Sequence, residues 1–300
     1  MKRVFLFFAV NLLVVLTISF FVNLLGIRPY LSAQGVDYGS LLVFCAMFGF
    51  GGAFVSLQLS RWMAKTAMGV QVLDPDRPGG AVETRLVAEV RDLCRRAGLS
   101  VLPEIGLYDS PEVNAFATGP SRSRALLAVS TGLLRAMDDR AVRGVLGHEV
   151  AHIANGDMVT MTLLQGVVNT FVMFLARVGA MAIDSALRSR DEEGRGGLGY
   201  FGHYMLVSVL ETVLMLFASP VIYYFSRVRE YRADRGSAGY LGAPVMIHAL
   251  EQLRDHKEAV DAGQPALATF KINGGASGVL AKLFSSHPPI EKRIAALRNV

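Results

Sequence analysis

The chain of 300 residues is 52% hydrophobic and only 18% charged, which excludes a disordered protein and is unusually apolar for a soluble enzyme. Its formal net charge is +5, but basic and aromatic residues do not cluster together, so nucleic acid is not expected as a partner. The two cysteines, Cys45 and Cys94, lie in segments too distant to pair, which excludes a disulfide framework. This composition indicates a membrane protein.

Two uncharged apolar runs begin the chain, at residues 4–27 and 40–60. As a helix, the first run spans about 36 Å, against about 30 Å for the hydrocarbon core of a bilayer. It is too long for a signal peptide, and no convincing cleavage site follows it. In the second run, Gly49 and Ala53 form a small-xxx-small pair that suits close packing against the first helix. We expect residues 1–60 to form a transmembrane hairpin.

Basic residues flank this hairpin on one side of the membrane. Lys2 and Arg3 precede the first span, and Arg61 and Lys65 follow the second. The positive-inside rule therefore places both ends in the cytoplasm. Residues 61–157 are expected to form the first part of a cytoplasmic domain.

Short elements are expected next, namely a helix over 83–97 and strands over roughly 103–108, 112–118 and 124–130. These strands predict a small sheet, whose edge strand can hold an extended peptide by main-chain hydrogen bonds. Asn114 and Phe116 are candidate substrate-binding residues on this strand. The equal alternative is that they are a turn residue and a core residue.

Residues 138–157, DDRAVRGVLGHEVAHIANGD, are predicted to form one helix. Asp138 or Asp139 can cap its start, and Asn155-Gly156 can close its end. His148 and His152 are four residues apart, so both imidazoles lie on one face and can hold one Zn²⁺. Glu149 stands beside them, where a carboxylate can take a proton from the attacking water. The alternative is a surface helix with two solvated histidines, but apolar neighbours would make unpaired imidazoles costly.

A second apolar hairpin follows at residues 158–225. Its first run, 158–183, carries Arg177 as its only charge, and its second, 201–225, carries Glu211. Both runs are expected to span the bilayer, and Arg177 and Glu211 are close enough in depth to form an intramembrane ion pair. The alternative is that both helices are partly buried against the soluble domain.

A third zinc ligand must lie on the same side of the membrane as His148. Because the chain returns to that side after residue 225, we expect this ligand within residues 226–300. There Glu230 and Asp234 lie four residues apart on one helical face. We expect Glu230 to be the ligand and Asp234 to bond to a ligand imidazole. A helix surface with mixed ion pairs is the alternative.

The last part of the chain completes this second half of the domain. An amphipathic helix is predicted over 243–256, and a loop over the site is predicted for 258–286. The terminal segment SSHPPIEKRIAALRN predicts a helix after the double proline, with Ile290, Ile294 and Leu297 on its inner face. His287 is a candidate catalytic donor to the developing oxyanion, or a capping residue.

With HEVAH, EYRAD, VNAFATG and SHPPIEKRI in order, the chain resembles the HtpX family of membrane-bound bacterial heat-shock zinc metalloproteases. It resembles the CAAX-type prenyl-protein endopeptidases more distantly. The resemblance implies one zinc ion held by His148, His152 and Glu230, with Glu149 as catalytic base. It also implies cleavage of misfolded or damaged proteins, in quality control at the cytoplasmic side of the bacterial inner membrane.

These observations predict a mainly α integral membrane protein, with transmembrane helices and a cytoplasmic α+β zincin-like (gluzincin) metalloprotease domain that holds a small sheet. The expected partners are polypeptide substrates and the lipid bilayer, and the oligomeric state is left open. One alternative is a prenyl-protein endopeptidase, which needs an enclosed chamber of more than four helices. The other is a non-catalytic adaptor with a structural zinc, against which the presence of Glu149 argues.

Overall fold

The computed structural model of the protein describes residues 31–32, 35–188, 197–263 and 287–299. The predicted span at 4–27 lies outside these residues. The described chain divides into two units. The first holds residues up to Ser56 together with Thr162–Ile222, and the second holds Leu57–Met161 and the chain from Tyr223 onward.

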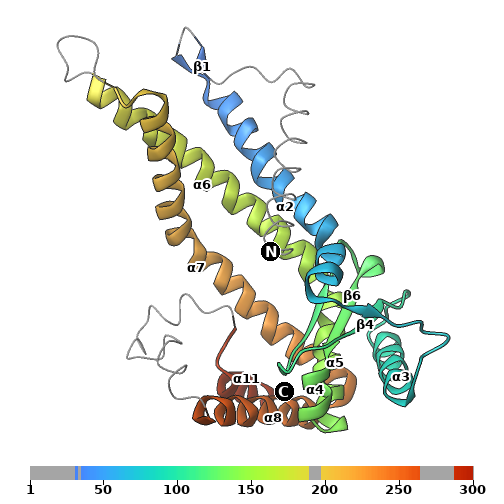
Figure 1. Ribbon diagram of the computed structural model, residues 1–300. Coiled ribbons are helices and arrows are strands. Elements are labelled where there is room, and N and C mark those ends of the chain that lie inside the picture. The colour runs from blue at the N-terminus through green and yellow to red at the C-terminus, as the bar shows by residue number, and fades with distance from the viewer. Residues whose placement is uncertain (1–30, 33–34, 189–196, 264–286, 300) are drawn as a thin grey trace. The chain divides into compact units, whose positions relative to one another are not determined.

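Long helices dominate the first unit (Figure 1). They are α2 (Tyr38–Met68), α6 (Asp157–Arg188) and α7 (Gly199–Leu241), and each continues into the second unit. All three are long and apolar enough to cross a membrane. A small hairpin of β1 (Leu31–Ser32) and β2 (Gly35–Val36) precedes α2. The apolar runs predicted at 40–60, 158–183 and 201–225 all lie within these helices.

Two close contacts join the helices of the first unit. A Cβ added to Gly49 would lie 2.5 Å from Thr170 Oγ1 and 2.9 Å from the Gly166 carbonyl oxygen, so α2 and α6 approach closely there. Gly49 was expected to pack against the first predicted span, which lies outside the described residues. The predicted ion pair is confirmed, because Arg177 Nη1 lies 2.6 Å from Glu211 Oε1 and links α6 to α7.

The second unit contains a four-stranded sheet in the order β3-β4-β6-β5. Its strands are β3 (Gln71–Val72), β4 (Glu104–Tyr108), β5 (Ala115–Thr118) and β6 (Leu126–Ser130). β4 and β6 are parallel, whereas β3 and β5 pair antiparallel with their neighbours. The three predicted strands are confirmed in somewhat shorter form. β3 was not predicted, because two residues are too few to show an alternating pattern.

The second unit also contains shorter helices. They are α3 (Ala81–Arg96), the 3₁₀ helix η1 (Arg122–Arg124), α4 (Thr131–Ala136), α5 (Asp139–Asn155), α8 (Ala243–Gly263) and α11 (Ile290–Leu297). Of these, α4 and α5 contact the sheet. The helices predicted over 83–97, 138–157 and 243–256 and the terminal helix are confirmed. The loop predicted from residue 258 onward was wrong at its start, because α8 runs on to Gly263, and residues 264–286 lie outside the described chain.

Local signals fix both ends of α5. The Asp138 carboxylate accepts a hydrogen bond from the Ala141 N–H at 2.7 Å, which caps the first turn. At the other end Gly156 adopts the left-handed conformation, with φ of 70°, and its N–H bonds back to the carbonyls of His152 and Ile153. The helix therefore begins and ends as the sequence predicts.

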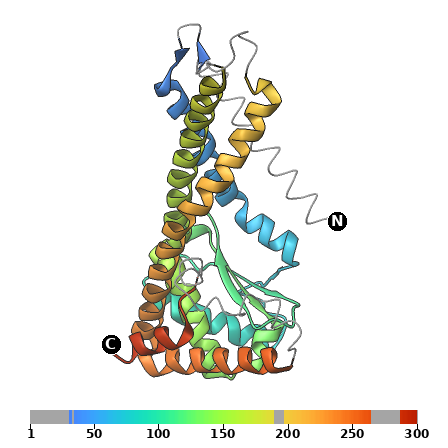
Figure 2. The same cartoon turned by 90° about the vertical axis from the view of Figure 1, so that its left-hand side faces the viewer.

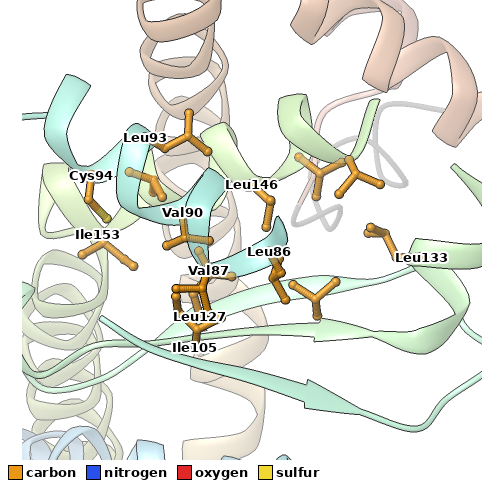
Figure 3. Packing of buried hydrophobic residues seen from close by; sticks show 14 of the residues in the cluster. Leu86, Val87, Val90, Leu93, Cys94, Ile105, Leu127, Leu133, Leu146 and Ile153 are labelled. Atoms are coloured by element: carbon orange, nitrogen blue, oxygen red, sulfur yellow. The ribbon is translucent and has the colours of Figure 1, made fainter. Parts of the chain in front are cut away.

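Two of the hydrophobic clusters in the second unit hold the helices of the site in place. In the first, Leu86, Val90 and Leu93 of α3 pack with Leu127 of β6 and Leu146 of α5 (Figure 3). In the second, α8 and α11 lie side by side (Figure 2) and bury the inner face formed by Met246, Leu250, Ile294 and Leu297. These cores hold α5 against the sheet and α11 against α8.

Candidate metal centre

Two helices bring three ligand-type side chains together in the second unit. His148 and His152 come from α5, and Glu230 comes from α7. The two Nε2 atoms lie 3.1 Å apart, and each lies 3.4 Å from an oxygen of Glu230. All three residues are buried, and one ligand atom from each lies within 4.8 Å of the others. Two imidazole nitrogens and a carboxylate oxygen converging in this way fit a metal ion.

Each histidine is oriented through its other ring nitrogen. His148 Nδ1 lies 2.9 Å from Asp234 Oδ1, and His152 Nδ1 lies 2.6 Å from Asp157 Oδ2. These contacts direct both Nε2 atoms toward Glu230. Asp234 was predicted in this position, but Asp157 was not. Asp157 is five residues beyond His152, off its helical face, and the turn at Gly156 brings it back.

Arg293 of α11 is a further residue of the site that sequence reasoning missed. Its guanidinium donates two hydrogen bonds to the Asp234 carboxylate, and its Nη1 lies 3.6 Å from Glu230 Oε2. The side chain is only 10% exposed. A signal was present in the sequence, because Arg293 is three residues after Ile290 and thus lies on the apolar face of the terminal helix.

His287 also lies at the site. Its Nδ1 is 3.1 Å from Glu230 Oε2, and its side chain is 64% exposed. The capping alternative for His287 was wrong, because Pro289 occupies the N-cap position of α11. An exposed imidazole beside the ligand carboxylate can contact a substrate that enters from solvent.

Glu149 belongs to the ligand helix α5, and its side chain lies next to β5 of the sheet. It is 9% exposed, and its carboxylate accepts a hydrogen bond from the backbone N–H of Ala117 in β5. β5 is one of the two edge strands of this sheet, and an edge is the position predicted for a peptide-binding strand. Asn114 directly precedes β5, and the ring of Phe116 packs on Tyr108 with the centroids 5.8 Å apart.

Small residues permit the close approach of α7 to α5. A Cβ added to Gly236 would lie 2.7 Å from the Cβ of Ala151, one residue before His152. Ser237 Oγ donates a hydrogen bond to the Gly144 carbonyl at 3.0 Å. The spacing between the helices that carry Glu230 and the histidines therefore depends on a glycine that faces an alanine.

The chain matches known proteins over its whole length. A family model described as Peptidase family M48 covers residues 81–300. The chain belongs to peptidase family M48. This M48 chain is 50% identical to the Protease HtpX homolog of Bacillus licheniformis, over 99% of this chain and 98% of that protein. It is 51% identical to the Protease HtpX of Shewanella putrefaciens, over 99% of each.

Among solved structures, the M48 chain is similar to Ste24p of S. mikatae, with a TM-score of 0.58 and 16% sequence identity. The likeness covers 85% of this chain and 58% of the longer one, and at this identity it shows the fold alone. The expected fold class and the resemblance to the HtpX family are thus confirmed. With its three candidate spans, this M48 chain is a membrane-bound metalloprotease that acts on polypeptides.

Charges around the M48 centre shift the protonation of its residues. Burial lowers the pKa of His152, but the bonds with Asp157 and Glu230 outweigh burial and raise that pKa to about 9. Burial also acts on His148, and its bonds with Asp234 and Glu230 likewise raise the pKa of its imidazole. Burial raises the pKa of the Glu149 carboxyl. The surrounding carboxylates thus favour positive charge at the histidines, as they would at a bound cation.

Proposed function

We propose that the centre binds one Zn²⁺ through His148, His152 and Glu230, and that the protein is a zinc endopeptidase. The observation that carries this proposal is the convergence of these three buried side chains beside a fourth, Glu149. Two imidazoles and one carboxylate form one of the donor sets of catalytic zinc sites, which keep one position open. Zinc held there polarises a carbonyl and lowers the pKa of a water molecule.

Glu149 acts as the general base of this reaction. Its carboxylate takes the proton of the attacking water and passes it to the leaving amine. The Ala117 N–H holds the carboxylate in place, and its burial raises the pKa of the side chain, which favours proton acceptance.

The substrate lies along β5 as an additional strand in this proposal. Because β5 is an edge strand, its outer main-chain groups can pair with an extended peptide of any sequence. Asn114 and Phe116 contribute contacts at this strand. His287 donates a hydrogen bond to the developing oxyanion, which its exposure and its place beside Glu230 support.

We place the active site on the cytoplasmic side of the bacterial inner membrane, and expect misfolded or damaged membrane proteins, with unfolded cytoplasmic proteins, as substrates. Lys2, Arg3, Arg61 and Lys65 support this orientation through the positive-inside rule. The proposed organisation is a transmembrane hairpin at 1–60, a protease domain at 61–157 and 226–300, and a second hairpin at 158–225.

The test of the reaction uses detergent-purified protein, an unfolded polypeptide as substrate and a measurement of bound zinc. Glu149→Gln keeps the size of the side chain but removes the base, so we expect it to bind zinc and to lose turnover by about a hundredfold or more. Glu112→Gln, an exposed site with the same chemical change, should cut as the wild type does. Equal cleavage by Glu149→Gln would rule out its role as the base.

The test of orientation uses single cysteines and a thiol reagent that cannot cross the membrane, applied to cells with a permeable outer membrane. The native Cys45 and Cys94 are buried. We expect Ser189→Cys, between the second pair of spans, to be labelled in intact cells, and Ser123→Cys to be labelled only after lysis. The reverse pattern would place the active site outside the cytoplasm.

A further inference from the structure

A cavity of about 560 Å³ lies in the second unit and shares no lining residue with the metal centre. Four short segments form it: the loop after α3, the start of η1, the end of α5 and the first turn of α6. The lining residues are Gly98, Leu99, Ser100, Val101, Ser121, Arg122, Ser123, Asn155, Gly156, Val159 and Thr160. Nothing in the proposed peptidase mechanism uses this cavity.

The polar groups of this cavity are suited to an anion. Arg122 is the only charged residue among the described residues that line it, and it forms no ion pair with any described acidic residue. Ser100, Ser121 and Ser123 also line the cavity, and Ser121 Oγ lies 3.2 Å from Ser123 Oγ. Asn155 contributes a buried side-chain N–H₂ group that has no hydrogen-bond partner within the described chain. A cation, hydroxyl donors and an unsatisfied amide together form a site for oxygen atoms that carry negative charge.

Arg122 has a simpler role that explains only part of this arrangement. Its Nε would lie 3.5 Å from a Cβ on Gly156, so the guanidinium lies over the end of α5, where a cation stabilises the helix dipole. That contact does not satisfy the Asn155 amide, and it leaves the cavity and its serines unexplained. A buried donor without a partner calls for a ligand group or water.

The apolar residues that line the cavity indicate which kind of anion it binds. Leu99 and Val101 line the cavity on one side, and Val101 is 44% exposed. Val159 and Thr160 belong to the first turn of α6, which is a candidate membrane span. The peptide N–H groups of such a first turn form the positive end of the helix dipole. The cavity thus combines anion-binding groups with apolar residues at the point where a span begins.

We propose that this cavity binds the phosphate-bearing headgroup of an anionic phospholipid. The phosphate accepts hydrogen bonds from Arg122, Asn155 and the serine hydroxyls, and the glycerol part of the lipid contacts Val101 and Val159. A carboxylate of a substrate polypeptide would satisfy the cation but has no need of an apolar rim at the start of a span, so the lipid is favoured.

A lipid in this position contacts the segment that joins the catalytic helix to the membrane. Asn155 and Gly156 follow His152 within one helical turn, and Asp157, which orients His152, comes next in the chain. Anionic lipid should therefore stabilise the end of α5 against unfolding. Phosphatidylcholine carries the same phosphate, but its trimethylammonium group brings a second positive charge close to Arg122, so it should stabilise this helix end less.

The experiment measures lipid retention by full-length, detergent-purified protein in native mass spectrometry, with phosphatidylglycerol and phosphatidylcholine as probes. We expect the wild type to retain one phosphatidylglycerol about tenfold more tightly than phosphatidylcholine. Arg122→Gln should abolish this preference. Arg124→Gln, the same change in the same 3₁₀ helix but outside the cavity lining, should keep it. Ser100→Phe, at an exposed position, should fill the cavity and also abolish the preference without changing any charge.

The remaining outcomes are equally decisive. An unchanged preference in both Arg122→Gln and Ser100→Phe would overturn the proposal. Displacement of the lipid by inorganic phosphate at a similar concentration would identify a free-phosphate site and also overturn it. So would a normal lipid preference in Arg122→Gln together with a specific loss of cleavage next to acidic residues, because the cavity would then bind substrate. The lipid readouts do not require the proposed zinc chemistry, and only the cleavage readout does.

Discussion

Arg293 donates two hydrogen bonds to Asp234, from Nε to Oδ2 at 2.7 Å and from Nη2 to Oδ1 at 2.6 Å. Asp234 in turn holds His148 through Nδ1, so the C-terminal helix fixes the orientation of a proposed metal ligand. A lysine can reach only one oxygen and cannot reproduce this planar pair. We therefore expect Arg293→Lys to weaken zinc binding by about tenfold to a hundredfold, as measured by competition with a chelator.

The control for this prediction is the neighbouring Lys292→Gln, which removes a charge from an exposed position on the same helix. It should leave zinc affinity and the melting temperature unchanged. If Arg293→Lys binds zinc as tightly as the wild type does, the contact with Asp234 is structural only and does not position His148.

Removal of the metal should make the centre sensitive to pH. Once a chelator has taken the metal, the raised pKa of His152, about 9, leaves its imidazole protonated at neutral pH. The metal binds the neutral imidazole, so rebinding releases a proton, and affinity should rise by about tenfold per pH unit for each proton released, up to about pH 9. Calorimetry in buffers of different ionisation enthalpy measures that proton release directly.

Asp157→Asn tests the cause of this dependence. The substitution removes the carboxylate that raises the pKa of His152, so the pH dependence of zinc affinity should become shallower. Affinity at the highest pH should also fall, because an amide orients the imidazole less strongly. A pH dependence as steep as that of the wild type would show that Asp157 does not control protonation of His152.

The spacing between α5 and α7 should be sensitive to one methyl group. Gly236→Ala places a Cβ 2.7 Å from that of Ala151, and neither group can rotate away. We expect a loss of about 1–3 kcal/mol in the free energy of unfolding, with weaker zinc binding because Glu230 moves relative to the histidines. Gly239→Ala is the matched control on α7, since no described atom beyond its local helix lies within 4 Å of the new Cβ. It should stabilise slightly, by about 0.5–1 kcal/mol.

The ion pair between Arg177 and Glu211 should couple α6 to α7. In a double-mutant cycle, Arg177→Met and Glu211→Gln should each destabilise the protein, because each leaves one charge unpaired within an apolar segment. The double variant should be less destabilised than the sum, with a coupling of about 0.5–3 kcal/mol in thermal unfolding in detergent. Strict additivity would mean that the two charges do not stabilise the pair of helices.

The helix that carries HEVAH could be predicted nearly to the residue, because every signal for it is local. Asp138 caps its first turn, Gly156 adopts the left-handed conformation that ends it, and the spacing of His148 and His152 needs only the helical period. The same holds for β4, β5 and β6, whose bounding turn residues are visible within a few residues of the sequence.

The orienting residues could not be predicted in the same way. The contact between His152 and Asp157 depends on the turn at Gly156, and the contact between Arg293 and Asp234 joins residues 59 positions apart. A charge pattern alone does not distinguish a buried arginine from a solvated one. The change of composition after residue 225 likewise hides the fact that α7 continues unbroken to Leu241.

The order in which the chain is made has a consequence for when it can act. Arg293 lies 145 residues beyond His148, and two candidate membrane helices are synthesised between them. A ribosome that has just released the catalytic helix has not yet made Glu230, Asp234 or Arg293. The nascent chain therefore carries an incomplete centre until the second helical hairpin and the last helix have emerged. Proteolysis by this molecule begins only after its own synthesis is nearly finished.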